Sequence, residues 1–289
     1  MTIFTSFLQP LLPYGLTCLG AHFVLWVVFK YLLPPGPWRE MPNFTAHQAV
    51  ALFLMIQWTY DGFFGDNTIH DTLDHLPYIL HTSSLGLRMA QRSVAALWIW
   101  DITVSTFSKD MGQAMDGIMH AHHLGMLLVA CVVLGHLTFG NATKEFPSPV
   151  GSPLAPIFFG QVELSSIPLQ VMDLFHPRKS APWNEYMKSS KTLTTINDTS
   201  RQLFALLFLA VRGIYFPYVV CTRVVPDFWD ALTWTSLHQE EAGKYIMPIV
   251  IILAFSIFFT LLQMYWAVLV VNQVQKALFG GEKVEKKKA

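Results

Sequence analysis

Charged side chains are scarce in this sequence. Lysine, arginine, aspartate and glutamate together make up 13% of its 289 residues, whereas 53% of the residues are hydrophobic. A soluble domain carries about 25% charged residues, so most of this chain is predicted to face something other than water. The formal net charge is +0, and there is therefore no basic excess to favour binding of nucleic acid.

Cysteine is scarce as well. Cys18, Cys131 and Cys221 lie far apart, each within an apolar run. This spacing favours small buried hydrophobic residues over a disulfide framework or a zinc site. The sequence also shows neither an internal repeat nor a second domain.

What the chain does contain is long apolar runs. A helix needs roughly 20 apolar residues to cross the hydrocarbon core of a bilayer. The sequence therefore predicts an all-α, polytopic membrane protein with about seven transmembrane helices. The predicted spans are residues 11–33, 46–62, 93–108, 120–140, 154–175, 203–222 and 246–271.

The lysines and arginines predict the orientation of these spans. If the N-terminus lies outside, most of the basic residues between spans fall in cytosolic segments, as the positive-inside rule requires. The polar stretch 176–202 is then a cytosolic loop, and the stretch 63–92 lies outside. Lys286 and Lys287 resemble the dilysine retrieval signal of proteins of the endoplasmic reticulum membrane. The alternatives are a basic tail held at an anionic membrane surface, and residence in a mitochondrial or other organelle membrane.

Of the ionisable residues within the predicted spans, five stand out: Asp101, His122, His123, Glu163 and Arg212. An ionisable side chain at bilayer depth costs roughly 2.5–3.5 kcal/mol on insertion scales, so it normally faces the interior of a bundle. The five residues lie on four different spans. We therefore expect them to converge on one interior cavity, with Arg212 paired to Glu163 or Asp101.

Helical spacing extends this polar group. Glu163, Ser166, Gln170 and Asp173 are spaced to share one face of the fifth span, and Arg212 and Tyr215 are spaced to share a face of the sixth. Pro168 and Pro217 fall within these spans. Each proline leaves one helical carbonyl without its usual donor and favours a kink.

The histidines near the start of the fourth span are the candidates for chemistry. A neutral imidazole can act as a general base or a nucleophile near neutral pH, although a single membrane histidine is more often a hydrogen-bonded packing residue. His123 is spaced to share a face with Asp116 and His120, and His122 is predicted to point elsewhere. The remaining histidines form no second paired motif, and this argues against a di-iron oxidase and against any metal site.

Several of these segments, in order, resemble motifs of the TLC-domain family, which includes the ceramide synthases. The matching segments are "NFTAHQAVALF", "LWIWDI", "HAHHLGML", "FGQVELSSIPLQ" and "FLAVRGIYFPYVV". The resemblance implies a six-helix membrane barrel within residues 40–272. An N-terminal helix and loop (1–39) would precede the barrel, and a basic cytosolic tail (273–289) would follow it.

The resemblance also implies roles for the polar residues. The paired histidines of the family transfer an acyl group from acyl-CoA to a sphingoid amine. His122, His123 and Asp101 would then be catalytic residues, and Glu163, Arg212, Tyr215 and Ser166 would bind substrate. No bound cofactor is expected, with acyl-CoA as a co-substrate.

This chain departs from the ceramide synthases in one respect. The acidic run that follows the histidine pair in their signature is absent after His123. Two functions therefore stay open. One is a lipid acyltransferase. The other is a non-catalytic lipid-binding or structural subunit, with membrane lipids and membrane proteins as partners.

Overall fold

The structure is a computed structural model that describes residues 3–70, 76–108, 110, 117–135, 149–237 and 239–279. Its architecture is all-α, as predicted, apart from a two-stranded antiparallel ladder that pairs Ile69 with Ser83 and His70 with Thr82. Lys286 and Lys287 of the predicted retrieval signal lie outside the described residues.

The elements follow one another as nearly continuous helical stretches, some of which contain short 3-10 or π-helical pieces (η). Their bounds are α1 (Ile3–Val27), η1 (Val28–Leu32), α2 (Pro37–Glu40), α3 (Pro42–Phe64), β1 (Ile69–His70), η2 (Tyr78–Leu80), β2 (Thr82–Ser83), α4 (Ser84–Val94), η3 (Ala95–Ile102), α5 (Thr103–Phe107), α6 (Gly117–Val133), η5 (Ser152–Leu154), α7 (Ala155–Phe159), η6 (Gln161–Ser165), α8 (Ser166–Leu174), α9 (Ala181–Lys188), α10 (Lys191–Leu207), η7 (Phe208–Tyr215), α11 (Phe216–Val219), η8 (Val220–Val224), α12 (Val225–Leu237) and α13 (Gln239–Phe279).

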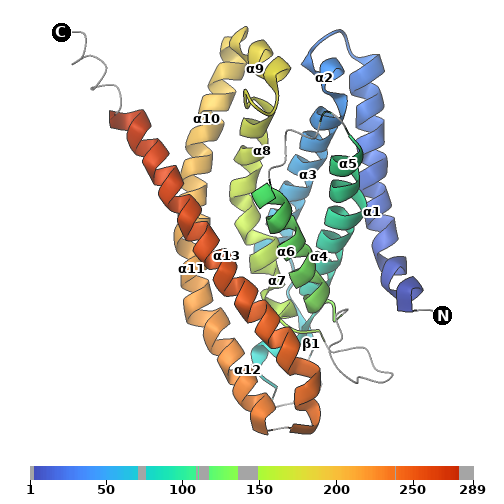
Figure 1. Cartoon of the computed structure of the whole chain (residues 1–289), viewed down its shortest axis with the longest axis vertical. Coiled ribbons are helices and arrows are strands. Elements are labelled where there is room, and N and C mark those ends of the chain that lie inside the picture. Colours follow the sequence, from blue (N-terminus) through green and yellow to red (C-terminus); the bar gives the residue numbers. More distant parts are fainter. Residues whose placement is uncertain are drawn as a thin grey trace.

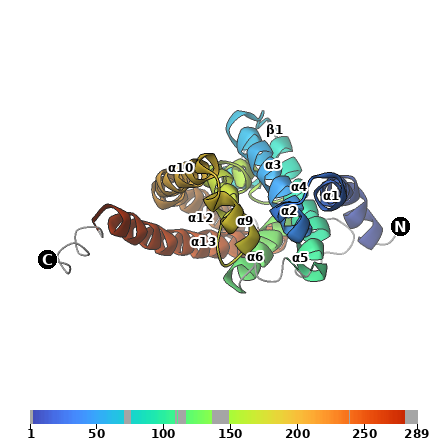
Figure 2. The same ribbon diagram turned by 90° about the horizontal axis from the view of Figure 1, so that it is seen from above.

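Successive long helices run in alternate directions along the bundle (Figure 1). α1 runs upward, α3 downward, α4 to α5 upward, α6 downward, α7 to α8 upward, α10 to α12 downward and α13 upward. Consequently α1 begins and α13 ends at opposite ends of the bundle. Seen from above, α13 leans out from the other helices, and α1 lies at the opposite side (Figure 2).

Three of these helices are long and apolar enough to cross a membrane. They are Gln9–Leu32, the continuous stretch Lys191–Leu237, and Tyr245–Phe279; a shorter apolar helix covers Ala121–Val133. The other predicted spans coincide with helices that are shorter or less apolar. By length and composition the described chain is thus that of an α-helical membrane protein.

Two polar stretches between predicted spans, 176–202 and 63–92, contain helices. In the stretch 176–202, α9 and the first half of α10 are helical, and the side-chain oxygen of Ser190 accepts a hydrogen bond from the backbone N–H of Leu193 at the start of α10 (3.4 Å). In the stretch 63–92, α4 begins at Ser84, and the side-chain oxygen of Ser83 accepts from the N–H of Gly86 (2.9 Å). These serines satisfy backbone donors that a helix end leaves without partners. The stretch 176–202, interpreted from the sequence as a cytosolic loop, is therefore largely helical.

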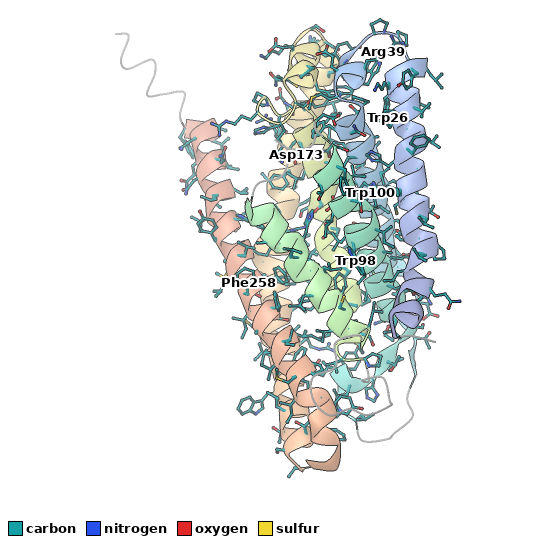
Figure 3. All side chains as sticks on the ribbon, turned by 45° about the vertical axis from the view of Figure 1, so that its right-hand side comes forward. Trp26, Arg39, Trp98, Trp100, Asp173 and Phe258 are labelled. Carbon is teal, nitrogen blue, oxygen red and sulfur yellow. The ribbon has the colours of Figure 1, made fainter. Side chains whose placement is uncertain are left out.

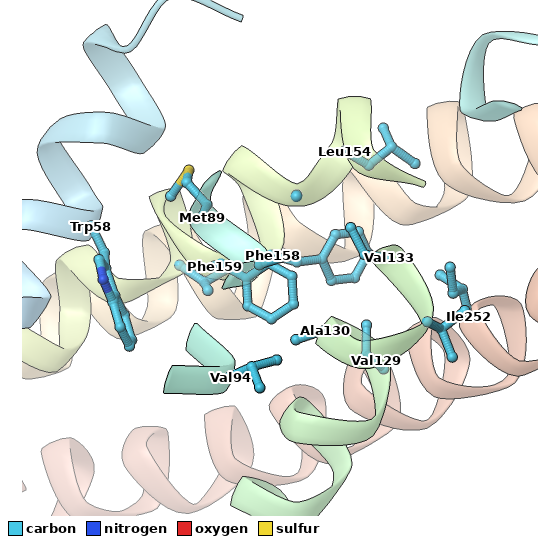
Figure 4. Packing of buried hydrophobic residues seen from close by; sticks show 14 of the residues in the cluster. Trp58, Met89, Val94, Val129, Ala130, Val133, Leu154, Phe158, Phe159 and Ile252 are labelled. Atoms are coloured by element: carbon cyan, nitrogen blue, oxygen red, sulfur yellow. The ribbon is translucent and has the colours of Figure 1, made fainter. Parts of the chain in front are cut away.

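A dense apolar core holds α4, α6, α7 and α13 together (Figure 4). Val94, Ala130 and Phe158 meet at its centre, each less than 10% exposed. Trp58 and Phe159 belong to the same buried cluster and also line the cavity described below. The core therefore fixes one wall of that cavity.

Two of the five ionisable residues singled out from the sequence lie in π-helical turns. Asp101 lies in η3 and Arg212 in η7. At the end of η7 the N–H of Phe216 reaches back five residues to the carbonyl of Val211, one residue before Pro217. The helix continues through this proline as one stretch, because the wider turn relieves the crowding that a proline ring causes in a regular α-helix.

Candidate functional site

A cavity of about 340 Å³ lies inside the bundle. Its walls come from α3, from α4 with η3, from α6, from α7 through α8, from α10 with η7, and from α13. Within the described residues, α1 contributes no lining residue; it packs instead on the outer side of α3 and η3. Four of the five ionisable residues line the cavity: His122, His123, Glu163 and Arg212. For these four, the expected convergence is confirmed.

The fifth residue, Asp101, stands one layer behind the cavity wall. Its side chain is 4% exposed, and its Oδ2 atom lies 2.8 Å from Nδ1 of His123. Oδ1 lies 2.8 Å from Nε2 of His47, which comes from α3. Trp100, which precedes Asp101 in the sequence, lies near the middle of the bundle's length (Figure 3). An ionised carboxylate only accepts hydrogen bonds, so both imidazoles donate to it.

This arrangement fixes the proton of His123. Because Nδ1 donates to Asp101, a neutral His123 carries its lone pair on Nε2. Nε2 is therefore the nitrogen that can accept a proton from a molecule bound in the cavity. The carboxylate also stabilises the positive charge that the ring acquires when it does so, as in other acid–histidine pairs.

His122 has a different environment. Its ring makes edge contacts with Phe259 and Trp266, at centroid distances of 5.4 Å and 6.0 Å. Its Nδ1 atom is buried and has no hydrogen-bond partner among the described residues. His122 lines the same cavity as His123 even though the two are adjacent in sequence, and their rings are 5.9 Å apart. It therefore does not point away from the site, as the helical spacing had suggested.

Arg212 is the most highly connected polar group of the cavity. Nη2 donates to Oε2 of Glu163 (3.2 Å) and to Oγ of Ser166 (2.8 Å). Nε donates to Oγ of Ser165 (2.8 Å) and to the carbonyl of Val162 (3.0 Å). The side chain is 8% exposed and that of Glu163 is 13% exposed. Of the two acids predicted as partner, the structure pairs Arg212 with Glu163.

Not every residue of the predicted polar faces reaches the cavity. Ser166 and Gln170 line it together with Glu163, but Asp173 forms an ion pair with Lys179 (2.5 Å). Asp173 lies nearer the upper end of the bundle in Figure 3. Tyr215 does not line the cavity; its hydroxyl donates to Oε1 of Gln161 (2.7 Å) on the outer side of the bundle. The structure therefore gives Tyr215 no contact with a ligand in this cavity.

Two residues that hydrogen-bond to the predicted site residues were missed from the sequence, Ser165 and His47. His47 could have been noticed, because it is a histidine inside a predicted span, where a polar side chain needs a partner. Neither residue completes a metal site: across the described part of the chain, no three histidine, cysteine, aspartate or glutamate side chains are placed to hold one ion.

The site thus combines a polar end, formed by Arg212 and its partners, with a histidine held by a buried carboxylate, inside a largely apolar cavity. Comparison of the chain with models of known protein families, with curated proteins and with solved structures finds no match.

Proposed function

We propose that this chain is a membrane-embedded lipid acyltransferase related to the TLC-domain family. The observation that carries the proposal is the 2.8 Å contact between Nδ1 of His123 and Oδ2 of Asp101 at the wall of an interior cavity. A carboxylate–histidine pair is the usual device for taking a proton from an attacking hydroxyl or amine. The lining of the cavity is mostly apolar, which favours the exclusion of bulk water and would protect a reactive acyl group from hydrolysis.

The proposed reaction is direct acyl transfer from a thioester. The nitrogen or oxygen of the acceptor's amine or hydroxyl attacks the carbonyl carbon of the thioester and forms a bond to it. At the same time Nε2 of His123 takes the proton of that amine or hydroxyl. The carbon–sulfur bond then breaks, and the thiolate leaves with the proton from His123, so that an amide or ester and a free thiol are formed. His122 faces the same space and can donate a hydrogen bond to the carbonyl oxygen as negative charge develops on it.

The size and polarity of the cavity fit this assignment. About 340 Å³ is at the small end of the range for ligand pockets. In the proposed reaction it would take up the reacting head group of the lipid and the thioester end of an acyl chain, and the rest of the coenzyme A molecule would stay outside. Arg212 and Glu163 offer both signs of charge to the polar part of the acceptor lipid. No bound cofactor is needed for this reaction.

We also propose the membrane arrangement that goes with this function. The seven helical stretches that match the predicted spans would all cross the bilayer, with six of them forming the TLC-type barrel. Their alternate directions and the placement of α1 outside the cavity support this topology. The basic residues favour an outside N-terminus and a cytosolic C-terminus, and Lys286 and Lys287 favour the endoplasmic reticulum over other organelle membranes.

The test is an assay of the purified protein in lipid vesicles. Isotope-labelled acyl-CoA is supplied with a long-chain amine or a long-chain alcohol, and the products are measured by mass spectrometry. We expect an acylated product from the wild type, and a loss of about 10²–10⁴-fold in His123→Ala and in the His122→Ala, His123→Ala double variant. His176→Ala, outside the cavity, is the matched histidine control and should retain activity. Cells carrying the double variant should show the same loss in their lipid profile.

The second candidate function is lipid binding without chemistry. The polar groups at one end of the cavity already satisfy one another, so the cavity can hold a lipid without reacting with it. In that case no acyl acceptor gives a product. A lipid would instead co-purify with the wild type, and bulky substitutions in the cavity, such as Leu169→Trp, would remove it.

A further inference from the structure

Asp101 has two histidine partners, and only one of them can meet a ligand. His123 lines the cavity, whereas His47 is not among its lining residues. Each imidazole lies 2.8 Å from a different carboxylate oxygen. Three helical stretches, α3, η3 and α6, therefore meet at one buried carboxylate.

The ring of His47 is fixed in both plane and direction. It stacks on Trp100, with ring centroids 4.7 Å apart and an angle of 17° between the planes. Trp100 precedes Asp101 in η3, so one short segment holds both the face of the ring and its Nε2 edge. The start of α3 is tied down as well, because the backbone N–H groups of Asn43 and Phe44 donate to Oδ2 of Asp110 (2.9 and 3.2 Å).

This arrangement carries a cost for the fold. His47 donates from Nε2, so in its neutral form Nδ1 is a bare acceptor. That atom is buried and has no hydrogen-bond partner among the residues that the structure describes. A buried acceptor without a donor destabilises a protein. A polar side chain that has one donor and no unpaired acceptor would bind Asp101 at a smaller cost in folding free energy.

The geometry points to His47 as a positioning residue for His123. Its hydrogen bond holds one oxygen of Asp101 so that the other oxygen stays on Nδ1 of His123. His123 is thereby kept in the tautomer whose Nε2 lone pair is available in the cavity. Without His47 the carboxylate is free to rotate toward another donor, and the proton of His123 is no longer confined to Nδ1. The catalytic meaning of this role rests on the proposed function, but the statement about the proton does not.

The direct readout is the position of that proton. Protein labelled with nitrogen-15 in its histidines, in lipid vesicles, is studied by solid-state NMR, and His123 is assigned by comparison with His123→Ala. In the wild type we expect a protonated Nδ1 and a bare Nε2. Asp101→Asn should move the proton to Nε2, because an amide nitrogen can donate to Nδ1 where the carboxylate only accepted.

Variants of His47 separate positioning from mere filling of space. A glutamine amide places its nitrogen near the position of Nε2 of histidine, and an asparagine amide places it near Nδ1. We therefore expect His47→Gln to keep the proton of His123 on Nδ1, and His47→Asn and His47→Leu to give a mixture of tautomers. Asn and Gln are both polar and small enough to fit in the space of His47. The Asn and Gln variants can therefore be compared with each other even if the Leu variant does not fold.

We expect the activities of the His47 variants to follow the order of their effects on the His123 tautomer. His47→Asn should lower kcat by about tenfold or more with little change in KM, because His47 does not line the cavity, and His47→Gln should stay within about threefold of the wild type. If His123 keeps its Nδ1 proton in both the Asn and Gln variants, His47 is not a positioning residue, whatever the activity. If the tautomer changes as expected but the wild type has no turnover with any acceptor, the inference about His47 stands and the acyltransferase proposal fails.

Discussion

The ion pair between Arg212 and Glu163 gives the sharpest prediction for stability. Replacing Arg212 with Met leaves the carboxylate of Glu163, 13% exposed, without its cation. It also removes the donors to Ser165, Ser166 and the carbonyl of Val162. Removing one partner of a buried pair costs roughly 3–5 kcal/mol. We expect Arg212→Met to destabilise the protein by about this amount.

Neutralising the acid as well should recover part of that loss. In the double variant Glu163→Gln, Arg212→Met no uncompensated charge is left in the cavity wall. The remaining cost is that of the polar groups which lost a donor, about 1–3 kcal/mol. The hydroxyl of Ser165 limits this cost, because it already donates to the carbonyl of Val162 (3.2 Å). We therefore expect the double variant to be more stable than Arg212→Met by about 2 kcal/mol.

Unfolding of the purified variants in mixed micelles with increasing SDS, followed by tryptophan fluorescence, measures these differences. Arg201→Met is the matched control, because Arg201 lies on the same continuous helix and is exposed; it should change the free energy of unfolding by less than about 0.5 kcal/mol. The reasoning is refuted if the double variant is no more stable than Arg212→Met, since the charge of Glu163 would then not be the cause of the loss.

Two further predictions concern packing and topology. A Cβ atom on Gly62 would lie 2.7 Å from the backbone nitrogen of Gln161, whereas one on Gly20 would meet nothing within 4 Å. Gly62→Ala should thus lower the free energy of unfolding by about 1–3 kcal/mol, and Gly20→Ala in α1 should raise it by about 0.5–1 kcal/mol; equal effects in the same SDS titration would contradict the close contact between α3 and η6. For topology, a tag at the C-terminus should be removed by protease from sealed microsomes, and Lys286→Ser with Lys287→Ser should release the protein to later compartments. A protected tag would overturn the orientation, and an unchanged location in mitochondria would overturn the retrieval signal.

The long apolar runs were predictable because their signal is local. Within the described residues each predicted span overlaps a helical stretch, and three of these helices meet the length and hydropathy that a membrane requires. The amphipathic helices were missed: the stretch that contains α9 and the start of α10 was interpreted as a loop, and no helix was predicted for most of α4. Their capping serines, Ser83 and Ser190, are the signals that identify them.

Residues three apart in the sequence could be assigned to the cavity lining only where the helical turn points their side chains in the same direction. Glu163 and Ser166 stay on one face, because side chains three residues apart eclipse in the 3-10 turn of η6. Arg212 and Tyr215 have the same spacing but lie within a π-helical segment, where hydrogen bonds span five residues. A wider turn separates side chains that an α-helix would align. Tyr215 accordingly faces away from the cavity, and a rule based on 3.6 residues per turn could not have shown it.

His47 shows what a different rule would have found. A buried carboxylate has two oxygens, and each needs at least one donor. The sequence offered the histidine pair and Arg212 as candidate partners of Asp101, and a single donor would leave the other oxygen without a partner. Because Asp101 has two acceptor oxygens, a second donor must come from another span. In the second predicted span, His47 is the side chain with a titratable N–H that can supply it. What the count could not give is its consequence: only the fold shows that this second histidine lies outside the cavity, where it can act on a bound lipid only through Asp101.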